Sequence, residues 1–202
     1  RRTTENGAYN LLSKQAKCGL AVPRNAVNPN TDAPPTYFIP TENEWYKAAY
    51  YNPTLNNNVG GYTLYATNSN NAPTNTPGDS VNSANLLYQG KLSVTQQLSL
   101  DSQQNYSTNV GSFTRSKGPY GTYDMNGSVW EMIDPATKSS PSIILRGGGW
   151  TSYFTYLQST YSIGGNAAAS GSNGGFRLIS EAANPAVMGY DLVKVGHPRN
   201  RK

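Results

Sequence analysis

The sequence is short of the side chains that most often carry out chemistry. It has one cysteine, Cys18, and one histidine, His197, among 202 residues. A lone cysteine excludes an internal disulfide and any all-cysteine metal site, and its simplest role is that of a small buried apolar residue. Because histidine is the usual general base and metal ligand, its near absence sharply narrows the catalytic options.

Charged residues are also scarce, at 13% of the chain. The net charge of +5 comes from the two ends, where five of the sixteen cations are found: Arg1, Arg2, Arg199, Arg201 and Lys202. The remaining eleven cations balance eleven acids, and a neutral body argues against a large nucleic-acid surface. The basic tail at 198–202 is either a solvated terminus or a functional basic segment. No stretch is long and apolar enough for a membrane span or a signal peptide, so a soluble protein is expected.

The chain is rich in small and polar residues that favour loops. Asn, Ser, Thr, Gly, Pro and Tyr fill most of the sequence outside the 36% that is hydrophobic. This composition favours short strands joined by long polar loops and is not that of a helical bundle. The length fits one domain, which we place at residues 1–180, followed by a C-terminal extension with the basic tail at 181–202.

The clearest local pattern predicts a short strand followed by a helix over 37–51. Thr41 is the expected N-cap, and Glu44 three residues later completes a capping box. Trp45, Ala48 and Ala49 then share one helical face, which predicts core packing.

Other segments predict short strands separated by turns. We expect them at 61–66, at 110–113, after the Asn126–Gly127 turn, at 143–146 and at 175–179. The glycines 147–149 interrupt the chain after the fourth of these strands. Three glycines in a row predict close backbone approach or unusual dihedral angles.

Five motifs in this order resemble those of the formylglycine-generating-enzyme, or sulfatase-modifying-factor, family. They are PTENEWYKAAYY, VGSF, YGTYDMNGSVWEM, LRGGGW and GGFRL, within 37–179. TTENGAY at Thr3–Tyr9 makes the chain similar to secreted bacterial, non-catalytic members. The resemblance implies an α+β fold of the C-type-lectin-like kind, with short twisted sheets and much irregular chain.

The same resemblance implies that the family's redox centre is missing. In the enzyme two cysteines bind copper shortly after the glycine run, and matching GGGWTSYFTYL to that pattern places Ser152 and Leu157 at these positions. Neither supplies the soft sulfur that copper(I) requires, so no catalytic residues and no copper are expected.

Family members often hold calcium near the YGTYDM stretch. Here Gly118 and Pro119 replace a common Asn-Gly pair, so calcium is left open with one oxygen ligand fewer.

A further departure concerns the front of the domain. The family's fold begins with a strand and a helix that have no counterpart before Arg1 in this sequence. Their absence would leave a sheet edge and an apolar face uncovered, and another chain would then have to shield them. We therefore expect an obligate assembly, such as a homo-oligomer, or a processed fragment.

The segment Thr151–Asn173 has the composition of an antibody paratope. It is dense in Tyr, Ser, Thr, Gly and Asn, which combine large contact area with adaptable hydrogen bonding. The predicted ligand-binding residues are Trp150, Ser152, Tyr153, Phe154, Tyr156, Tyr161, Asn166 and Asn173. By resemblance, this position matches the variable region of receptors diversified by retroelements.

Three classes of function remain open. A binding or adhesion module for a protein or glycan ligand predicts exposed aromatics around Trp150. A structural subunit of a surface or virion assembly predicts the same aromatics buried between chains. A residual enzyme predicts convergent carboxylates among Glu42, Glu44, Asp124, Glu131 and Asp134. An extracellular, cell-surface or virion location follows from the resemblance.

Overall fold

The computed structural model describes residues 7–12, 22–76, 81–134, 142–166, 173–180 and 193–195. Cys18, His197 and the basic tail lie outside these ranges, so the roles expected for them stay predictions. Among the described residues, no helix combines the length and the apolar character needed to cross a membrane.

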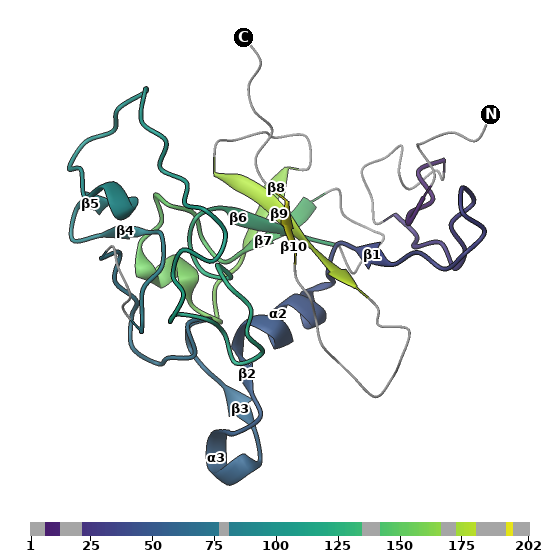
Figure 1. The fold of residues 1–202 in the computed structure, drawn as a ribbon, viewed down its shortest axis with the longest axis horizontal. Helices are drawn as coiled ribbons and strands as arrows, with labels where there is room; N and C mark the ends of the chain where they lie inside the picture. Colours follow the sequence, from purple (N-terminus) through teal and green to yellow (C-terminus); the bar gives the residue numbers. More distant parts are fainter. Residues whose placement is uncertain are drawn as a thin grey trace.

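A mixed sheet forms the centre of the fold (Figure 1). Its strand order is β1 (Tyr37–Phe38), β9 (Gly174–Ser180), β6 (Trp130–Ile133), β7 (Ser142–Arg146) and β8 (Ile163–Asn166). Strand β10 (Val193–Val195) also pairs with β9, so part of the segment expected as an extension joins the sheet. All pairs are antiparallel except β6 with β9, which is parallel. The strands expected at 143–146 and 175–179 are confirmed.

Helix α2 (Glu42–Tyr50) follows β1 and packs on one face of the sheet. The predicted capping box is confirmed: the Thr41 side chain accepts a hydrogen bond from the Glu44 backbone, and the Glu44 carboxylate accepts one from the Thr41 backbone at 2.7 Å. Trp45, Ala48 and Ala49 are fully buried, as the helical spacing predicts. Together with Tyr50, Ala66, Met125 and Ile133 they form one hydrophobic core cluster.

The remaining elements are short, as the polar composition predicts. They are β2 (Tyr51–Asn52) paired with β3 (Gly61–Tyr62), helix α3 (Leu55–Asn58), β4 (Leu87–Tyr88) paired with β5 (Lys91–Leu92), and the 3-10 helices η1 (Ser93–Thr95) and η2 (Phe154–Leu157). Only two residues of the strand expected at 61–66 form one. Beyond Tyr62 the chain turns inward, and Thr63, Tyr65 and Ala66 are buried.

The strand expected at 110–113 is wrong. These residues form a turn in which only Phe113 is buried, while Val110 is exposed. The Gly111 backbone N–H donates to the Asp124 carboxylate at 2.7 Å instead of to a neighbouring strand. This short apolar run has no strand partner and is instead a loop held by the Asp124 side chain.

A buried ion pair lies between the sheet and α2. The guanidinium of Arg177 on β9 donates two hydrogen bonds to the carboxylate of Glu131 on β6, and both side chains are 1% exposed. Trp45 of α2 donates its indole N–H to the same carboxylate at 2.7 Å. The three motifs that carry these residues, PTENEW, VWEM and GGFRL, are thus held together at one point.

Candidate functional site

The glycine run after β7 adopts backbone angles and contacts that a side chain would not allow. Gly147 and Gly148 have φ of 88° and 75°. A Cβ at Gly147 would lie 2.7 Å from the Met125 carbonyl oxygen, and one at Gly148 would lie 2.5 Å from Leu157 Cδ1. The close approach expected from the sequence is therefore confirmed, and it brings the following loop back against the core.

The two positions that match the copper-binding cysteines now have structural roles. Ser152 is buried, and its hydroxyl accepts a hydrogen bond from the Gly149 backbone at 2.9 Å. Leu157 is fully buried in a core cluster with Tyr65, Ala84 and Leu86. Because one side chain holds the loop and the other fills the core, the residues present do not fit a copper ion.

Trp150 is also part of the hydrophobic core. Its ring is 9% exposed and stacks on Tyr106, with ring centroids 4.6 Å apart and planes inclined by only 8°. The exposed aromatic patch that a binding module predicts around Trp150 does not include Trp150 itself, because its ring is buried below the surface of the loop. Ser152, also predicted to bind a ligand, is buried as well. They support the loop from beneath.

The exposed aromatics lie one layer further out. Tyr153 is 52% exposed, and Phe154 and Tyr156 are each 37% exposed. Tyr161 packs on Tyr156 with ring centroids 4.8 Å apart, and both rings approach Trp130 of β6 at 6.2–6.4 Å. We call the five rings of Trp130, Tyr153, Phe154, Tyr156 and Tyr161 the loop face.

Trp130 is the member of the loop face that sequence reasoning missed. It lies in the motif YGTYDMNGSVWEM, where burial alternates along β6 and Trp130 is on the less buried side. The signal was the period of two in a strand: Glu131 and Ile133 point inward, so Trp130 points the other way.

Polar groups border the loop face. The Asn173 amide donates to the Thr151 hydroxyl at 3.4 Å, and the Asn173 carbonyl accepts from the Trp130 backbone at 2.7 Å. Asn166 ends β8 opposite Ser142, at the far end of that strand from Tyr161. No Asp, Glu, Lys, Arg or His occurs between Arg146 and Arg177, so the loop is uncharged throughout.

Of the five carboxylates proposed for a residual enzyme, only Glu44 and Asp134 lie near each other, and Arg24 contacts both. Glu42 pairs with Arg146, Glu131 pairs with Arg177, and the Arg24 guanidinium contacts both Glu44 and Asp134. Asp124 accepts from the Gly111 backbone. Within the described ranges, no three or more His, Cys, Asp or Glu side chains are grouped so that they could hold a metal ion. The donors near YGTYDM therefore do not fit a calcium site built on carboxylates.

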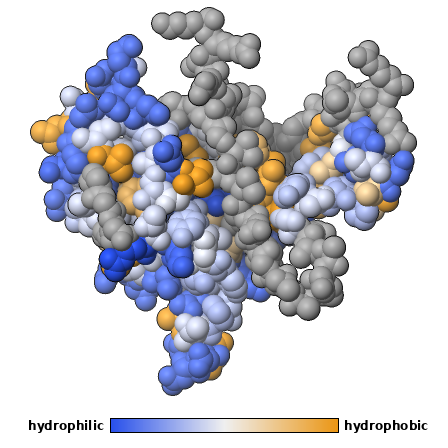
Figure 2. Space-filling view, in the orientation of Figure 1, coloured by the Kyte–Doolittle hydropathy of each residue, from blue (hydrophilic) through white to orange (hydrophobic). Residues whose placement is uncertain are grey.

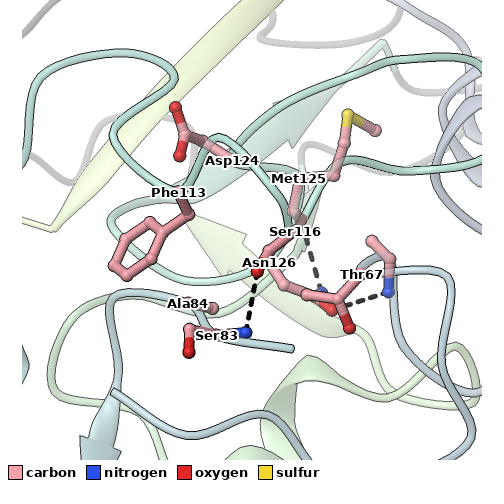
Figure 3. A pocket seen from close by; sticks show the side chains of 9 residues that line it. Thr67, Ser83, Ala84, Phe113, Ser116, Asp124, Met125 and Asn126 are labelled. Atoms are coloured by element: carbon pink, nitrogen blue, oxygen red, sulfur yellow. Dashed lines mark hydrogen bonds between the residues drawn. The ribbon is translucent and has the colours of Figure 1, made fainter. Parts of the chain in front are cut away.

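The cavity beside Asp124 is too small for an organic substrate (Figure 3). Its volume is about 10 Å³, and it is lined by Ala66, Thr67, Ser83, Ala84, Phe113, Ser116, Asp124, Met125 and Asn126. Ser116 accepts from the Ser83 backbone at 2.9 Å, and Asn126 accepts from the Ala66 backbone at 2.7 Å. Such a space holds about one water molecule, and its polar groups already bind neighbouring loops.

A second polar cluster ties the residues around Tyr9 to the sheet. The Tyr9 hydroxyl and the Arg24 guanidinium both reach Asp134, and Arg24 also reaches Glu44. Burial, followed by the nearby Asp134 charge, raises the pKa of Tyr9 to about 12. Burial alone would raise the pKa of Glu44, but hydrogen bonds from Thr41 and Arg24 outweigh it and lower that pKa. Burial raises the pKa of Asp134 despite Arg24. The hydrogen bonds among these side chains, and not the pKa shifts, make this cluster a structural junction.

The comparisons agree with this geometry. The family described as sulfatase-modifying factor enzyme 1-like domain matches residues 8–182, so the chain belongs to that family. Its fold is the α+β, C-type-lectin-like fold of short sheets and irregular chain.

Two solved structures are similar to the chain. One is the Treponema denticola variable protein 1, at 22% identity and a TM-score of 0.42, and the other is CarF, at 19% identity and a TM-score of 0.42. Each match covers 70% of this chain and 46% of the other, so the chain spans about half the length of either protein. No match is found among curated protein sequences.

Proposed function

We propose that this chain is a non-catalytic binding domain that contacts a protein or glycan partner through the loop face. The observation that carries the proposal is the layered arrangement of the aromatics. Trp150 is stacked on Tyr106 inside the domain, whereas Tyr153, Phe154 and Tyr156 remain 37–52% exposed on a rigid support. Aromatic rings that are held in place bind with little loss of conformational entropy.

The composition around the loop face indicates the kind of partner. Thirty uncharged residues separate Arg146 from Arg177, so the surface offers aromatic, hydroxyl and amide groups but no ion pairs. Such a surface suits uncharged partners and disfavours phosphate-rich ones such as nucleic acids. A display role at an extracellular, cell or virion surface is part of this proposal.

Loss of the redox centre supports a binding role over a catalytic one. Ser152 and Leu157 occupy the two cysteine positions, and each makes contacts that stabilise the loop. The family's scaffold is kept while its metal chemistry is abandoned. This is the pattern expected when the fold serves to present loops.

The experiment uses two arrays, one of glycans and one of displayed peptides, screened with the folded domain. Ligands found in this way are then measured against a loop-face variant, Tyr153→Ser with Tyr156→Ser, and against a matched control, Leu98→Ser with Leu100→Ser. The control removes exposed apolar side chains elsewhere, since Leu98 is 78% and Leu100 is 64% exposed. We expect the loop-face variant to lose at least about tenfold in affinity and the control to lose none. Equal losses in both variants would contradict the proposal.

A further inference from the structure

A second group of aromatic rings lies where α2 runs into β2. The rings of Tyr46, Tyr62, Tyr51 and Tyr120 follow one another in that order, with centroids 5.2, 5.2 and 6.4 Å apart. We call these four rings the tyrosine row. Tyr46 belongs to α2, and Tyr51 pairs with Tyr62 across β2 and β3, which project from the body of the domain (Figure 1). The row is therefore one aromatic surface built from three elements and the turn around Tyr120.

The tyrosine row is held from beneath. Tyr46 packs on the fully buried ring of Tyr50, with centroids 5.1 Å apart. The Thr122 hydroxyl donates to the Ala48 carbonyl of α2 at 3.2 Å, which holds the turn at 118–122 against the helix. Because ordered rings have little conformational entropy left to lose, such a surface is suited to binding.

The outer side of the tyrosine row is open. Tyr62 is 54% exposed, and the other three tyrosines are half-buried. Among the described residues, the hydroxyls of Tyr46, Tyr51 and Tyr62 have no hydrogen-bond partner. By contrast, the hydroxyl of Tyr50 donates to a backbone carbonyl, and that of Tyr65 accepts from a side-chain amide. The row thus offers both ring surface and unused hydroxyls to a ligand.

The segments that carry the tyrosine row are positively charged. The only charged residue in 45–62 is Lys47, and the only charged residues in 102–123 are Arg115 and Lys117. Lys117 is exposed and directly precedes the turn that is held against α2. An anionic partner would complement this charge, and a cationic one would be repelled.

Lys47 is the cation that lies on the row itself. Its ammonium is 5.8 Å from the centre of the Tyr51 ring, and it forms no ion pair with the acids that the structure describes. Arg146 lies over Tyr46, but Glu42 neutralises it. An uncharged partner would cover the Lys47 ammonium without pairing it, which costs free energy. This charge therefore favours a ligand that brings an anion to the row beside Tyr51.

We propose that the tyrosine row binds an acidic polysaccharide, with sugar rings on the tyrosines and a carboxylate at Lys47. The apolar C–H face of a sugar packs on an aromatic ring, and sugar hydroxyls bond to the free tyrosine hydroxyls. The spacing of neighbouring rings is comparable with the length of one sugar unit, so successive units can contact successive tyrosines. A nucleic acid carries a phosphate on every unit and needs clustered Lys and Arg, whereas these segments supply three cations in all.

This inference goes beyond the proposed binding function because the tyrosine row and the loop face share no residue. The loop face is uncharged and suits neutral partners, whereas the row carries positive charge and selects acidic ones. Loss of one site therefore leaves the other in place, and the two proposals can fail separately.

The test measures the binding of oligogalacturonate, a chain of sugar carboxylates, to the folded domain by isothermal titration calorimetry. The same chain with its carboxylates methyl-esterified is the matched neutral ligand. We expect the acidic chain to bind at least about tenfold more tightly than the ester. Its affinity should fall as salt is raised from about 0.05 to about 0.5 M, because salt screens the charge of the lysines.

Two variants and two matched controls locate the site. Tyr62→Ser removes the most exposed ring of the row, and Lys47→Gln removes its charge. The controls are Tyr37→Ser, where the tyrosine is 51% exposed on β1, and Lys91→Gln, where the lysine is exposed on β5. We expect each row variant to weaken binding at least about tenfold and each control to leave it unchanged. Lys47→Gln carries the test alone if Tyr62→Ser does not fold.

Four results would overturn the proposal. Three are no binding of the acidic chain, equal affinity for its ester, and equal losses in row variants and controls. The fourth is tighter binding of an oligothymidylate of the same length, which would indicate a site for single-stranded nucleic acid. The loop-face variant Tyr153→Ser with Tyr156→Ser must bind the acidic chain as the wild type does. A domain that binds no acidic chain but keeps its loop-face ligand would contradict this inference alone.

Discussion

Ser152 and Leu157 border the same glycine. A Cβ at Gly148 would lie 2.5 Å from Leu157 Cδ1 and 3.4 Å from Ser152 Cβ, so both side chains lie next to this glycine. These are the positions at which the resemblance to the enzyme places its copper-binding cysteines. A serine and a leucine thus lie beside one glycine, where the resemblance implies two sulfur ligands.

This geometry predicts that the double variant Ser152→Cys with Leu157→Cys regains a paired thiol site. Thiolates are the donors that copper(I) prefers, and two held side by side bind it far better than one. We expect one copper(I) per double-variant chain in a competition titration against a chromogenic chelator. Each single variant is the matched control and should bind much more weakly. Equal affinity of the double and single variants would show that the two positions are apart.

Breaking the buried ion pair should cost a large part of the domain's stability. Arg177→Met leaves the Glu131 carboxylate, which is 1% exposed, without its charge partner. The expected loss is about 3–5 kcal/mol in the free energy of unfolding, measured by urea denaturation. Adding Glu131→Gln, which keeps an acceptor for Trp45, should recover part of the loss. A single-variant cost below about 1 kcal/mol would mean that the pair is solvated.

Alkaline pH should loosen the junction at Tyr9. The folded pKa of Tyr9 is raised to about 12 from 10.0, chiefly by burial. Its contribution to stability is therefore complete below pH 10 and is lost as the pH rises from 10 to about 12. Burial also raises the pKa of Tyr50, which adds to the same decline. Tyr9→Phe should show a shallower fall in unfolding free energy over this range than the wild type, and parallel curves would refute the assignment.

The cap of α2 offers a smaller and local test. Thr41→Ala removes a hydroxyl that accepts from the Glu44 backbone and also contacts the Glu44 carboxylate at 2.8 Å. The expected loss of stability is about 1 kcal/mol. Thr41→Ser keeps the hydroxyl and should stay within about 0.5 kcal/mol of the wild type. A comparable loss in both variants would show that the methyl group, and not the cap, matters.

The sequence predicted well those features that depend on neighbours in the chain. The capping box at Thr41, the buried stripe of α2 and the glycine run after β7 follow from residues within a few positions of each other. Features set by distant partners were missed. Trp150 is buried because Tyr106, forty-four positions earlier, lies flat against it, and Val110–Phe113 is a loop because Asp124 anchors Gly111.

The same distinction holds for the candidate binding residues. Tyr153, Phe154 and Tyr156 are exposed, as their polar surroundings predict, whereas Ser152 is held inside by the Gly149 backbone. Trp130 was overlooked because its motif contains the core residue Glu131, and only the strand register separates their two faces. Figure 2 shows small apolar groups scattered over a mostly hydrophilic surface. Composition alone therefore does not indicate which exposed residues form a binding face.

The central claim is that this domain binds without catalysing. It is tested most directly by incubating the protein with copper(I) and a cysteine-containing peptide under oxygen. Mass spectrometry of the peptide reports whether its thiol has become an aldehyde. The account predicts no conversion above that of copper in buffer, because Ser152 and Leu157 supply no sulfur ligand. Turnover that depends on the folded protein would contradict it.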